Sequence, residues 1–155
     1  MTLGSWRIVK RKHTSDAFSG EGARLFGGRW NSPGIPVVYT AENASLAVLE
    51  ILAHFDIGPL LPHYVMVQIK FKENLVAIIE EDELPREWRA HIESKELMII
   101  GDRWAGEAHS AVLSVPNTIV PVERNYLLNP QHPDFSEIEI GEPIPFSLDA
   151  RLART

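Results

Sequence analysis

A glycine-rich stretch near the start of the chain carries side chains that could bind an anion. Residues 22–34 read GARLFGGRWNSPG, and their four glycines and one proline do not suit the interior of a helix or strand. Glycine lets the backbone approach a ligand closely, and the guanidinium groups of Arg24 and Arg29 match the oxygens of a phosphate or carboxylate. The stretch therefore predicts a loop that clamps a phosphate group. A glycine turn whose arginines pair with surface acids accounts for Arg29 equally well.

This loop differs from the common nucleotide-binding motifs. It has neither the P-loop pattern G-x-x-x-x-G-K-[ST] nor a G-x-G-x-x-G sequence after a strand. Trp30, next to Arg29, is expected in the hydrophobic core.

A carboxylate in an apolar helix is the second candidate for chemistry. The pattern of residues 43–56 predicts a helix that is largely buried. At 3.6 residues per turn, one apolar face holds Leu46, Leu49, Leu52 and Ala53. A narrow sector remains for Ala47, Glu50 and His54. Glu50 is therefore either a site carboxylate at the edge of a buried surface or the surface partner of His54, one turn later.

Two further residues are weaker candidates. Tyr39 ends a predicted strand eleven residues before Glu50, so a strand, a turn and a helix could bring the two side chains together. An ordinary core tyrosine is the alternative. Ser114 lies in the apolar run AVLSVP, where a buried hydroxyl needs a hydrogen-bond partner and usually finds it on the backbone. The six histidines are scattered without the H-E-x-x-H spacing, so we expect no metal site.

The composition is that of an ordinary globular domain. The chain has 155 residues, of which 45% are apolar and 23% charged, which suits one domain with its own core. The absence of cysteine excludes disulfides, thiolate nucleophiles and cysteine-bound zinc. The net charge of −6 counts against direct binding of nucleic acid, which requires Lys and Arg to neutralise phosphates. Neither a secretory signal nor a long apolar segment is visible, so we expect a cytoplasmic protein without membrane contact.

Short predicted strands and helices are intermixed along the chain. They predict a mixed α/β (α+β) single domain with a twisted, largely antiparallel or mixed sheet and flanking helices. The expected strands lie at 5–10, 35–40, 63–71 and 74–80, on both sides of Pro116-Asn117, and as extended segments in 124–146. The expected helices are 43–56, capped by Thr40 or Asn43 and ending before Gly58-Pro59, then 84–91, and 94–107, ended or interrupted near Gly101. Residues 11–35 are expected to be mostly loop.

Four motifs in order along the chain resemble one known family. They are GGRWNSPGIPVVYT, SLAVLE, AVLSVPN and ERNYLLNPQHPDF, and together they resemble the RES domain. That family is named for an Arg, a Glu and a Ser, which here correspond to Arg29, Glu50 and Ser114. The resemblance runs from WRIVKRKH to PDFSEIEI, which gives a RES domain at 1–145 and a C-terminal tail at 146–155.

The resemblance implies a fold, a biological role and a substrate. RES proteins are toxins of bacterial toxin–antitoxin pairs, neutralised by an Xre-type DNA-binding antitoxin, and their fold is similar to that of ADP-ribosyltransferases. They consume NAD. By resemblance, this chain would cleave the bond between nicotinamide and ribose and pass ADP-ribose to an acceptor, which could be water, phosphate or, as we slightly favour, a protein.

The resemblance also implies roles for individual residues. The glycine-rich loop, with Gly28 and Asn31, would cradle the NAD pyrophosphate, with Arg29 as the main contact and Arg24 as a supporting one. Tyr39 would stack on the nicotinamide ring. Glu50 would face the nicotinamide ribose and stabilise the positive charge that develops there. Ser114 would hydrogen-bond a ligand, or orient Glu50 or an arginine.

Two other functions remain open from the residues alone. An RNA-cutting toxin is disfavoured by the acidic charge and by the lack of a basic, aromatic-rich face. A protein that only uses its groove to hold an antitoxin segment is disfavoured because Arg29, Tyr39, Glu50 and Ser114 are all present. The expected partners are therefore an Xre-type antitoxin, NAD as substrate and a possible protein acceptor, without metal, direct nucleic-acid contact or membrane.

Overall fold

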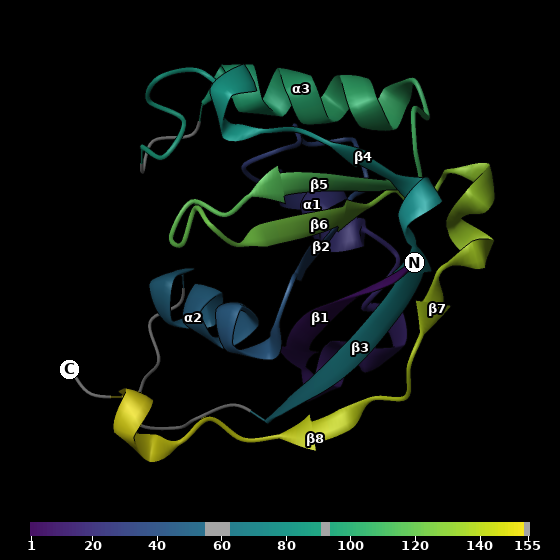
Figure 1. The fold of residues 1–155 in the computed structure, drawn as a ribbon. Helices are drawn as coiled ribbons and strands as arrows, with labels where there is room; N and C mark the ends of the chain where they lie inside the picture. Colours follow the sequence, from purple (N-terminus) through teal and green to yellow (C-terminus); the bar gives the residue numbers. More distant parts are fainter. Residues whose placement is uncertain (55–62, 91–93, 154–155) are drawn as a thin grey trace.

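The computed structural model describes residues 1–54, 63–90 and 94–153. These residues form one eight-stranded mixed sheet with three α-helices (Figure 1). The strands are β1 (Thr2–Lys10), β2 (Val38–Ala41), β3 (Tyr64–Lys72), β4 (Val76–Ile78), β5 (Val112–Pro116), β6 (Arg124–Leu128), β7 (Glu139–Ile140) and β8 (Ile144–Phe146). The helices are α1 (Glu21–Phe26), α2 (Ala44–His54) and α3 (Lys95–Gly106). The expected mixed fold with a twisted mixed sheet is confirmed.

The sheet has two well-paired parts that meet at a weak junction. Its order is β4-β5-β6-β2-β1-β3-β7, with β8 also paired to β3; only β4 and β5 run parallel within this described set. β1 pairs with β3 from Thr2 to Lys10, whereas β1 and β2 share one register pair, Trp6 with Ala41. The two parts therefore separate beyond that pair, and Figure 1 shows α2 beside the opening.

Helix α3 covers one face of the β4-β5-β6-β2 part of the sheet (Figure 1). The core under it contains Trp30, Val37, Trp88, Leu97, Trp104, Leu113, Val115 and Leu127. Helix α3 continues five residues past Gly101, so the expected end or interruption there is wrong. A Cβ on Gly101 would lie 1.6 Å from the Trp30 carbonyl oxygen. The glycine is present because the helix contacts the backbone of the glycine-rich loop directly.

Helix α2 packs differently from the predicted orientation. Its buried residues are Leu46, Ala47 and Ile51, while Leu49 is 37% exposed. The predicted apolar face with Leu49 and Ala53 is therefore wrong, because the helix turns Ala47 and its neighbours inward instead. The expected cap at Asn43 is confirmed, since the Leu46 backbone N–H donates to Asn43 Oδ1 at 2.7 Å. The predicted residues 55 and 56, and the stop signal at Gly58-Pro59, lie outside the described residues.

Other local predictions differ from the structure where tertiary contacts decide. Helix α1 forms inside the expected 11–35 loop, and residues 84–90 of the predicted 84–91 helix form turns, with His91 outside the described residues. The strand expected just after Asn117 is absent from that described segment, because the Asn117 side chain closes a turn there. The next strand, β6, begins at Arg124 and lies inside the sheet. Within the described residues, no helix is long and apolar enough to cross a membrane.

Candidate active site

A pocket of about 730 Å³ opens where β1 and β2 separate. Its volume is within the range of small-molecule sites, roughly 300–1,000 Å³. Residues of β1, β2, α1, α2, β6 and the glycine-rich loop line it. Among them are four candidates from the sequence, Gly28, Arg29, Tyr39 and Glu50. Arg24, Asn31 and Ser114 are not part of the lining.

Glu50 reaches the pocket from helix α2 and is held by a buried amide. Asn125 Nδ2 on β6 donates to Glu50 Oε1 at 3.0 Å. Burial raises the pKa of the Glu50 carboxyl from its ordinary value of 4.5 to about 7, and the Asn125 hydrogen bond opposes this by favouring the carboxylate. His54 lines the same pocket, but the hydrogen bond to Glu50 comes from Asn125. A carboxyl with a pKa near 7 in a pocket is typical of functional sites.

The glycine-rich loop is a tight turn held by Tyr39. Gly27 has φ +74°, a conformation that favours glycine, and it ends α1. The Tyr39 hydroxyl donates to Asn31 Oδ1 at 2.5 Å and accepts the Trp30 backbone N–H at 3.1 Å. A Cβ on Gly28 would lie 2.7 Å from that hydroxyl. The phenol therefore fixes the loop beside the pocket, and its burial raises its pKa.

Two loop residues predicted to bind ligand lie elsewhere. Asn31 is fully buried, and its Nδ2 donates to the carbonyls of Ala23 and Ile35, both at 2.9 Å. Its contacts therefore shape the loop from behind. At the surface of α1, Arg24 donates through Nε to Glu21 at 2.8 Å and through a second nitrogen to the other Glu21 oxygen. A contact of either residue with a ligand stays a prediction.

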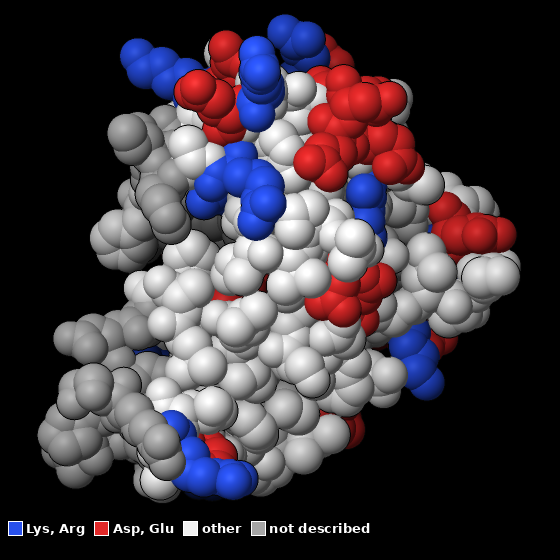
Figure 2. All heavy atoms as spheres, turned by 60° about the vertical axis from the view of Figure 1, so that its left-hand side comes forward, with Lys and Arg blue, Asp and Glu red and all other residues white. Residues whose placement is uncertain are grey.

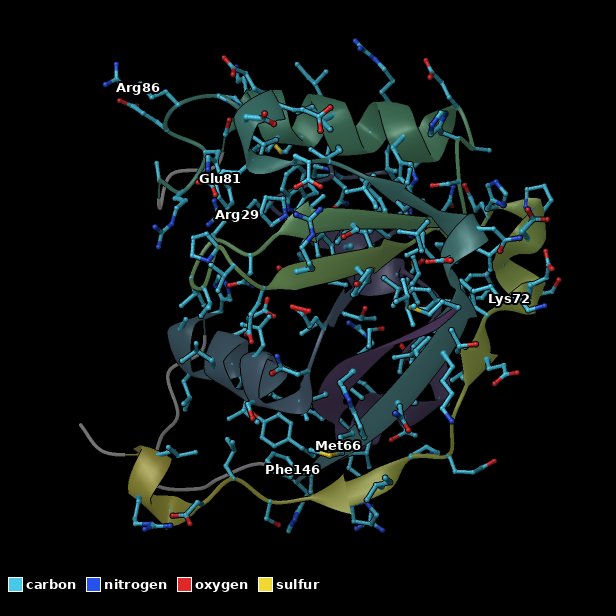
Figure 3. The ribbon with its side chains drawn as sticks, in the orientation of Figure 1. Arg29, Met66, Lys72, Glu81, Arg86 and Phe146 are labelled. Carbon is cyan, nitrogen blue, oxygen red and sulfur yellow. The ribbon has the colours of Figure 1, made fainter. Side chains whose placement is uncertain are left out.

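Arg29 lines the pocket and also contacts the turn before α3. One of its terminal nitrogens donates to the carbonyls of Ala90 at 3.1 Å and Trp88 at 3.4 Å. Figure 3 shows Arg29 on the side of the molecule that carries α2, near the loop between β5 and β6. The pKa of His54 is lowered by burial and, secondarily, by the positive charge of Arg29, which favours a neutral imidazole.

Sequence reasoning missed Arg7, a second arginine in the pocket. It comes from the middle of β1, and its guanidinium donates to the carbonyls of Ala17 at 2.7 Å and Tyr39 at 2.8 Å. Burial lowers its pKa to about 10, with Asp16 opposing the change, so it stays a cation at neutral pH. The sequence signal that could have identified Arg7 is an arginine within a predicted strand whose side chains should face a core. Asn125 was missed because its segment was expected to be no more than extended chain.

Ser114 lies on the other face of the sheet from Tyr39. On β6, Tyr126 is the register partner of Ser114 and Leu127 is the register partner of Tyr39. Tyr126 and Leu127 are neighbours on that strand, and neighbouring residues on a strand point to opposite faces. Ser114 Oγ accepts Nε of Arg124 at 2.8 Å. Of the three predicted partners, ligand, Glu50 or an arginine, the structure pairs it with an arginine that does not line the pocket. A role of this serine in catalysis stays a prediction.

The charges in the pocket define what it could bind. Arg7 and Arg29 supply two cations, and Glu50 supplies a carboxylate that ionises near neutral pH. Over the described residues, no group of three metal-ligating side chains is present. Figure 2 shows few charges over the middle of the face on the α2 side and more toward its upper, α3 end. A ligand with an anionic part and a centre that becomes positive during reaction suits this arrangement.

Comparison with known proteins adds the family. A sequence model of the RES domain matches residues 5–149. The chain belongs to the RES domain family. It is 41% identical to Toxin Res of Photorhabdus laumondii over 150 residues, 96% of each chain. It is 36% identical over 159 residues to the Prs ADP-ribosylating toxin of a Sphingobium species, with 99% of each chain covered. A match of 37 residues, 23% of this chain and 20% of the relative, is 54% identical to the NAD(+) phosphorylase MbcT of Mycobacterium bovis.

A solved structure shares the fold of this RES domain. The crystal structure of the MbcT–MbcA toxin–antitoxin complex of M. tuberculosis superposes with a TM-score of 0.76, covering 99% of this chain and 87% of the matched chain. The sequence identity is 20%, so this likeness concerns the fold. The family match ends at residue 149. The domain boundary expected at residue 145 stays a prediction.

Proposed function

We propose that this chain is an NAD-consuming toxin of a toxin–antitoxin pair. It cleaves the bond between nicotinamide and ribose and passes ADP-ribose to an acceptor. The observation that carries the proposal is one pocket that combines the Glu50 carboxylate, with a pKa of about 7, and the cations Arg7 and Arg29. The names of the full-length relatives, Toxin Res and Prs ADP-ribosylating toxin, support it.

The chemistry of NAD fits this set of residues. The pyrophosphate is anionic, and Arg29 with the backbone around Gly28 would hold it. Arg7 would supply a second positive charge on the β1 side. Tyr39 fixes the loop through its hydroxyl, and the face of its ring would stack on nicotinamide. Each of these groups lines the same pocket.

Glu50 acts at the step in which nicotinamide leaves. Nicotinamide departs with the electron pair of the C–N bond, and the ribose carbon becomes oxocarbenium-like. The Glu50 carboxylate stabilises this charge and accepts a hydrogen bond from a ribose hydroxyl. An acceptor oxygen then forms the new bond to that carbon, and its proton goes to solvent. Because the carboxylate is the active form, kcat/KM is expected to rise with pH through the Glu50 pKa near 7.

The acceptor proposed first is a protein side chain. The relative named as an ADP-ribosylating toxin matches 99% of the chain, whereas the phosphorylase matches 23%. The name of that relative contains the word Prs, so a protein similar to Prs is the first candidate for the acceptor. Hydrolysis and phosphorolysis are the alternatives, because all three reactions share the departure of nicotinamide. The proposal includes an Xre-type antitoxin as partner and a cytoplasmic location.

The first test measures cleavage directly. The purified protein is incubated with NAD, with and without phosphate or cell lysate, and nicotinamide release is followed by chromatography. We expect release with wild type and a loss of roughly 10²–10³ in kcat for Glu50→Gln, with little change in KM. Arg29→Ala is expected to raise KM more strongly, because it removes a contact already made in the ground state.

Each outcome of this test has a defined meaning. The mass of the co-product identifies the acceptor as water, phosphate or protein. Near-normal turnover by Glu50→Gln would contradict the role given to the carboxylate. No release of nicotinamide under any condition would contradict the proposed function as a whole.

A further inference from the structure

Asn125, the residue that contacts Glu50, has a fixed amide orientation. Its Nδ2 donates to the Thr40 carbonyl at 3.1 Å and to Glu50 Oε1 at 3.0 Å. A carbonyl oxygen accepts and cannot donate, so the NH₂ group of Asn125 has to face Thr40. The same NH₂ group then faces Glu50 with its second hydrogen. Glu50 Oε1 is therefore an acceptor in every protonation state, and any proton on the carboxyl resides on Oε2.

Asn117 also fixes the orientation of the Asn125 amide, through the amide oxygen. Its Oδ1 accepts the backbone N–H groups of Ile119 and Val120, both at 2.8 Å. Its Nδ2 therefore points the other way and donates to Asn125 Oδ1 at 2.7 Å. Asn117 is 1% exposed and is not part of the pocket lining. Backbone groups at both ends thus give the two amides one consistent direction.

The loop that Asn117 closes also contacts the segment that holds Arg29. The Thr118 carbonyl accepts Nε of Arg89 at 2.8 Å, and the Ile119 carbonyl accepts a second Arg89 nitrogen at 3.4 Å. Arg89 lies between Trp88 and Ala90, whose carbonyls accept Arg29. Hydrogen bonds therefore lead from Asn117 to Glu50, and hydrogen bonds together with the backbone of residues 88–90 link Asn117 to Arg29.

We propose that Asn117 is a positioning residue for two parts of the site at once. Through Asn125 it orients the Glu50 carboxylate, and through the 118–120 loop and Arg89 it holds the backbone that contacts Arg29. This inference rests on the proposed function for its kinetic consequences. The hydrogen bonds to Glu50 also predict a property that does not depend on activity, namely the ionisation of the Glu50 carboxyl.

Asn117→Asp separates the two branches of this network, the first through Asn125 to Glu50 and the second through Arg89 to Arg29. The aspartate can still accept the N–H groups of residues 119 and 120, so the loop and Arg89 are kept. It has no donor for Asn125 Oδ1, so two oxygens face each other and repel, and the Asn125 amide is displaced from Glu50. We expect kcat to fall about tenfold with KM nearly unchanged. Because a hydrogen bond to the carboxylate is lost, the pKa of Glu50 and the acid side of the kcat profile should rise by about one unit.

Other charged groups of the pocket stay constant in this comparison. Arg7, Arg29, Tyr39 and His54 line the pocket with Glu50, and the substitution changes none of them. Asn129→Asp is the matched control, because Asn129 is a buried asparagine outside the pocket lining that donates to the Ala105 carbonyl and accepts the Gln131 N–H. It should leave the pH profile unchanged.

Arg89→Ala tests the second branch. We expect KM for NAD to rise about fivefold with a small change in kcat, because Arg29 is displaced while Glu50 is not. Arg86→Ala is the control, since Figure 3 shows the exposed Arg86 pointing outward, away from Arg29. Asn117→Ala removes the acceptor of the loop N–H groups as well and should change both kcat and KM.

Carboxyl titration by ¹³C NMR completes the test and does not require turnover. If wild type fails to cleave NAD, the proposed function fails, while a higher Glu50 pKa in both Asn117→Asp and Asn117→Ser, which adds no charge, still supports the amide network. An unchanged Glu50 pKa in Asn117→Asp, or in Asn117→Ser if the aspartate variant does not fold, overturns the first branch. Equal KM values for Arg89→Ala and Arg86→Ala overturn the second.

Discussion

The two walls of the pocket are held in different ways. The loop wall, residues 27–32, is fixed from behind by α3: Gly101 contacts the Trp30 carbonyl, and Asp102 accepts the Ser32 N–H at 2.8 Å and its hydroxyl at 2.6 Å. The carboxylate wall, Glu50 with Asn125, is held by side-chain amides. Backbone packing places a cation that is always charged, whereas amide hydrogen bonds place a carboxylate and also adjust its ionisation.

The largest expected effect comes from breaking the packing behind the loop wall. Gly101→Ala would put a methyl group 1.6 Å from the Trp30 carbonyl oxygen, so the helix or the loop has to move. We expect a loss of about 3–5 kcal/mol in the free energy of unfolding. We also expect a fall of about 10² in kcat/KM, because Arg29 adjoins Trp30. Thermal unfolding and NAD cleavage measure the two effects.

Gly106→Ala is the matched control for this substitution. Gly106 lies at the end of the same helix, and a Cβ there would have no atom within 4 Å. It should therefore leave both stability and kcat/KM close to wild type. Alanine has a higher helix propensity than glycine, so propensity alone cannot lower the stability of either variant. Comparable losses in the two variants would therefore contradict the contact with Trp30 as the cause.

The carboxylate wall should instead produce a pH dependence of the stability. Folding raises the pKa of Glu50 from 4.5 to about 7, so the native state binds the proton more tightly than the unfolded state. The resulting stability is fully present below pH 4.5 and is lost as the pH rises through 7. One pKa unit is about 1.4 kcal/mol, so the loss is up to about 3 kcal/mol.

Glu50→Gln should remove this dependence, since glutamine keeps an acceptor for Asn125 and does not ionise. We expect the variant to be more stable than wild type at pH 8 and similar at pH 4.5, as measured by denaturant unfolding. Glu81→Gln, a change of an exposed carboxyl, serves as control. Parallel stability profiles for wild type and Glu50→Gln would contradict the raised pKa.

The difference between the walls also explains what the sequence could predict. Arg29, Tyr39 and Glu50 were proposed from the glycine-rich motif, the apolar helix and the family resemblance, and the structure brings all three to one pocket. Asn125 could not be placed, because its position depends on β6 pairing with β5 and β2, where its partners Val115 and Ala41 lie 10 and 84 residues away in the chain.

Long-range contact likewise explains the misinterpretation of Gly101. A glycine in a helical pattern ordinarily weakens the helix, and the sequence therefore predicts an end or an interruption there. The reason to keep it is a loop whose Trp30 backbone, 71 residues earlier, lies against that position. Arg7 shows the same limit, since its pocket appears only when β1 and β2 separate after Trp6.

A smaller effect is expected at Tyr39, which holds the loop wall from β2. Tyr39→Phe leaves Asn31 Oδ1 and the Trp30 N–H without the hydroxyl that pairs with both. We expect a loss of about 1–3 kcal/mol in stability and a rise in KM, with the ring itself retained. Tyr64→Phe, a buried tyrosine outside the pocket lining, is the control. Unchanged KM in Tyr39→Phe would mean that the loop keeps its shape without the phenol.

The smallest effect should distinguish the two loop arginines. Arg24 pairs with Glu21 at the surface of α1, whereas Arg29 lines the pocket. Exposed pairs of this kind contribute little to stability, and an arginine already paired with a carboxylate has less to offer a phosphate. We therefore expect Arg24→Ala to change KM for NAD by less than about twofold, while Arg29→Ala raises it strongly. A large rise in KM for Arg24→Ala would show that NAD draws Arg24 away from Glu21 and that the loop wall extends to α1.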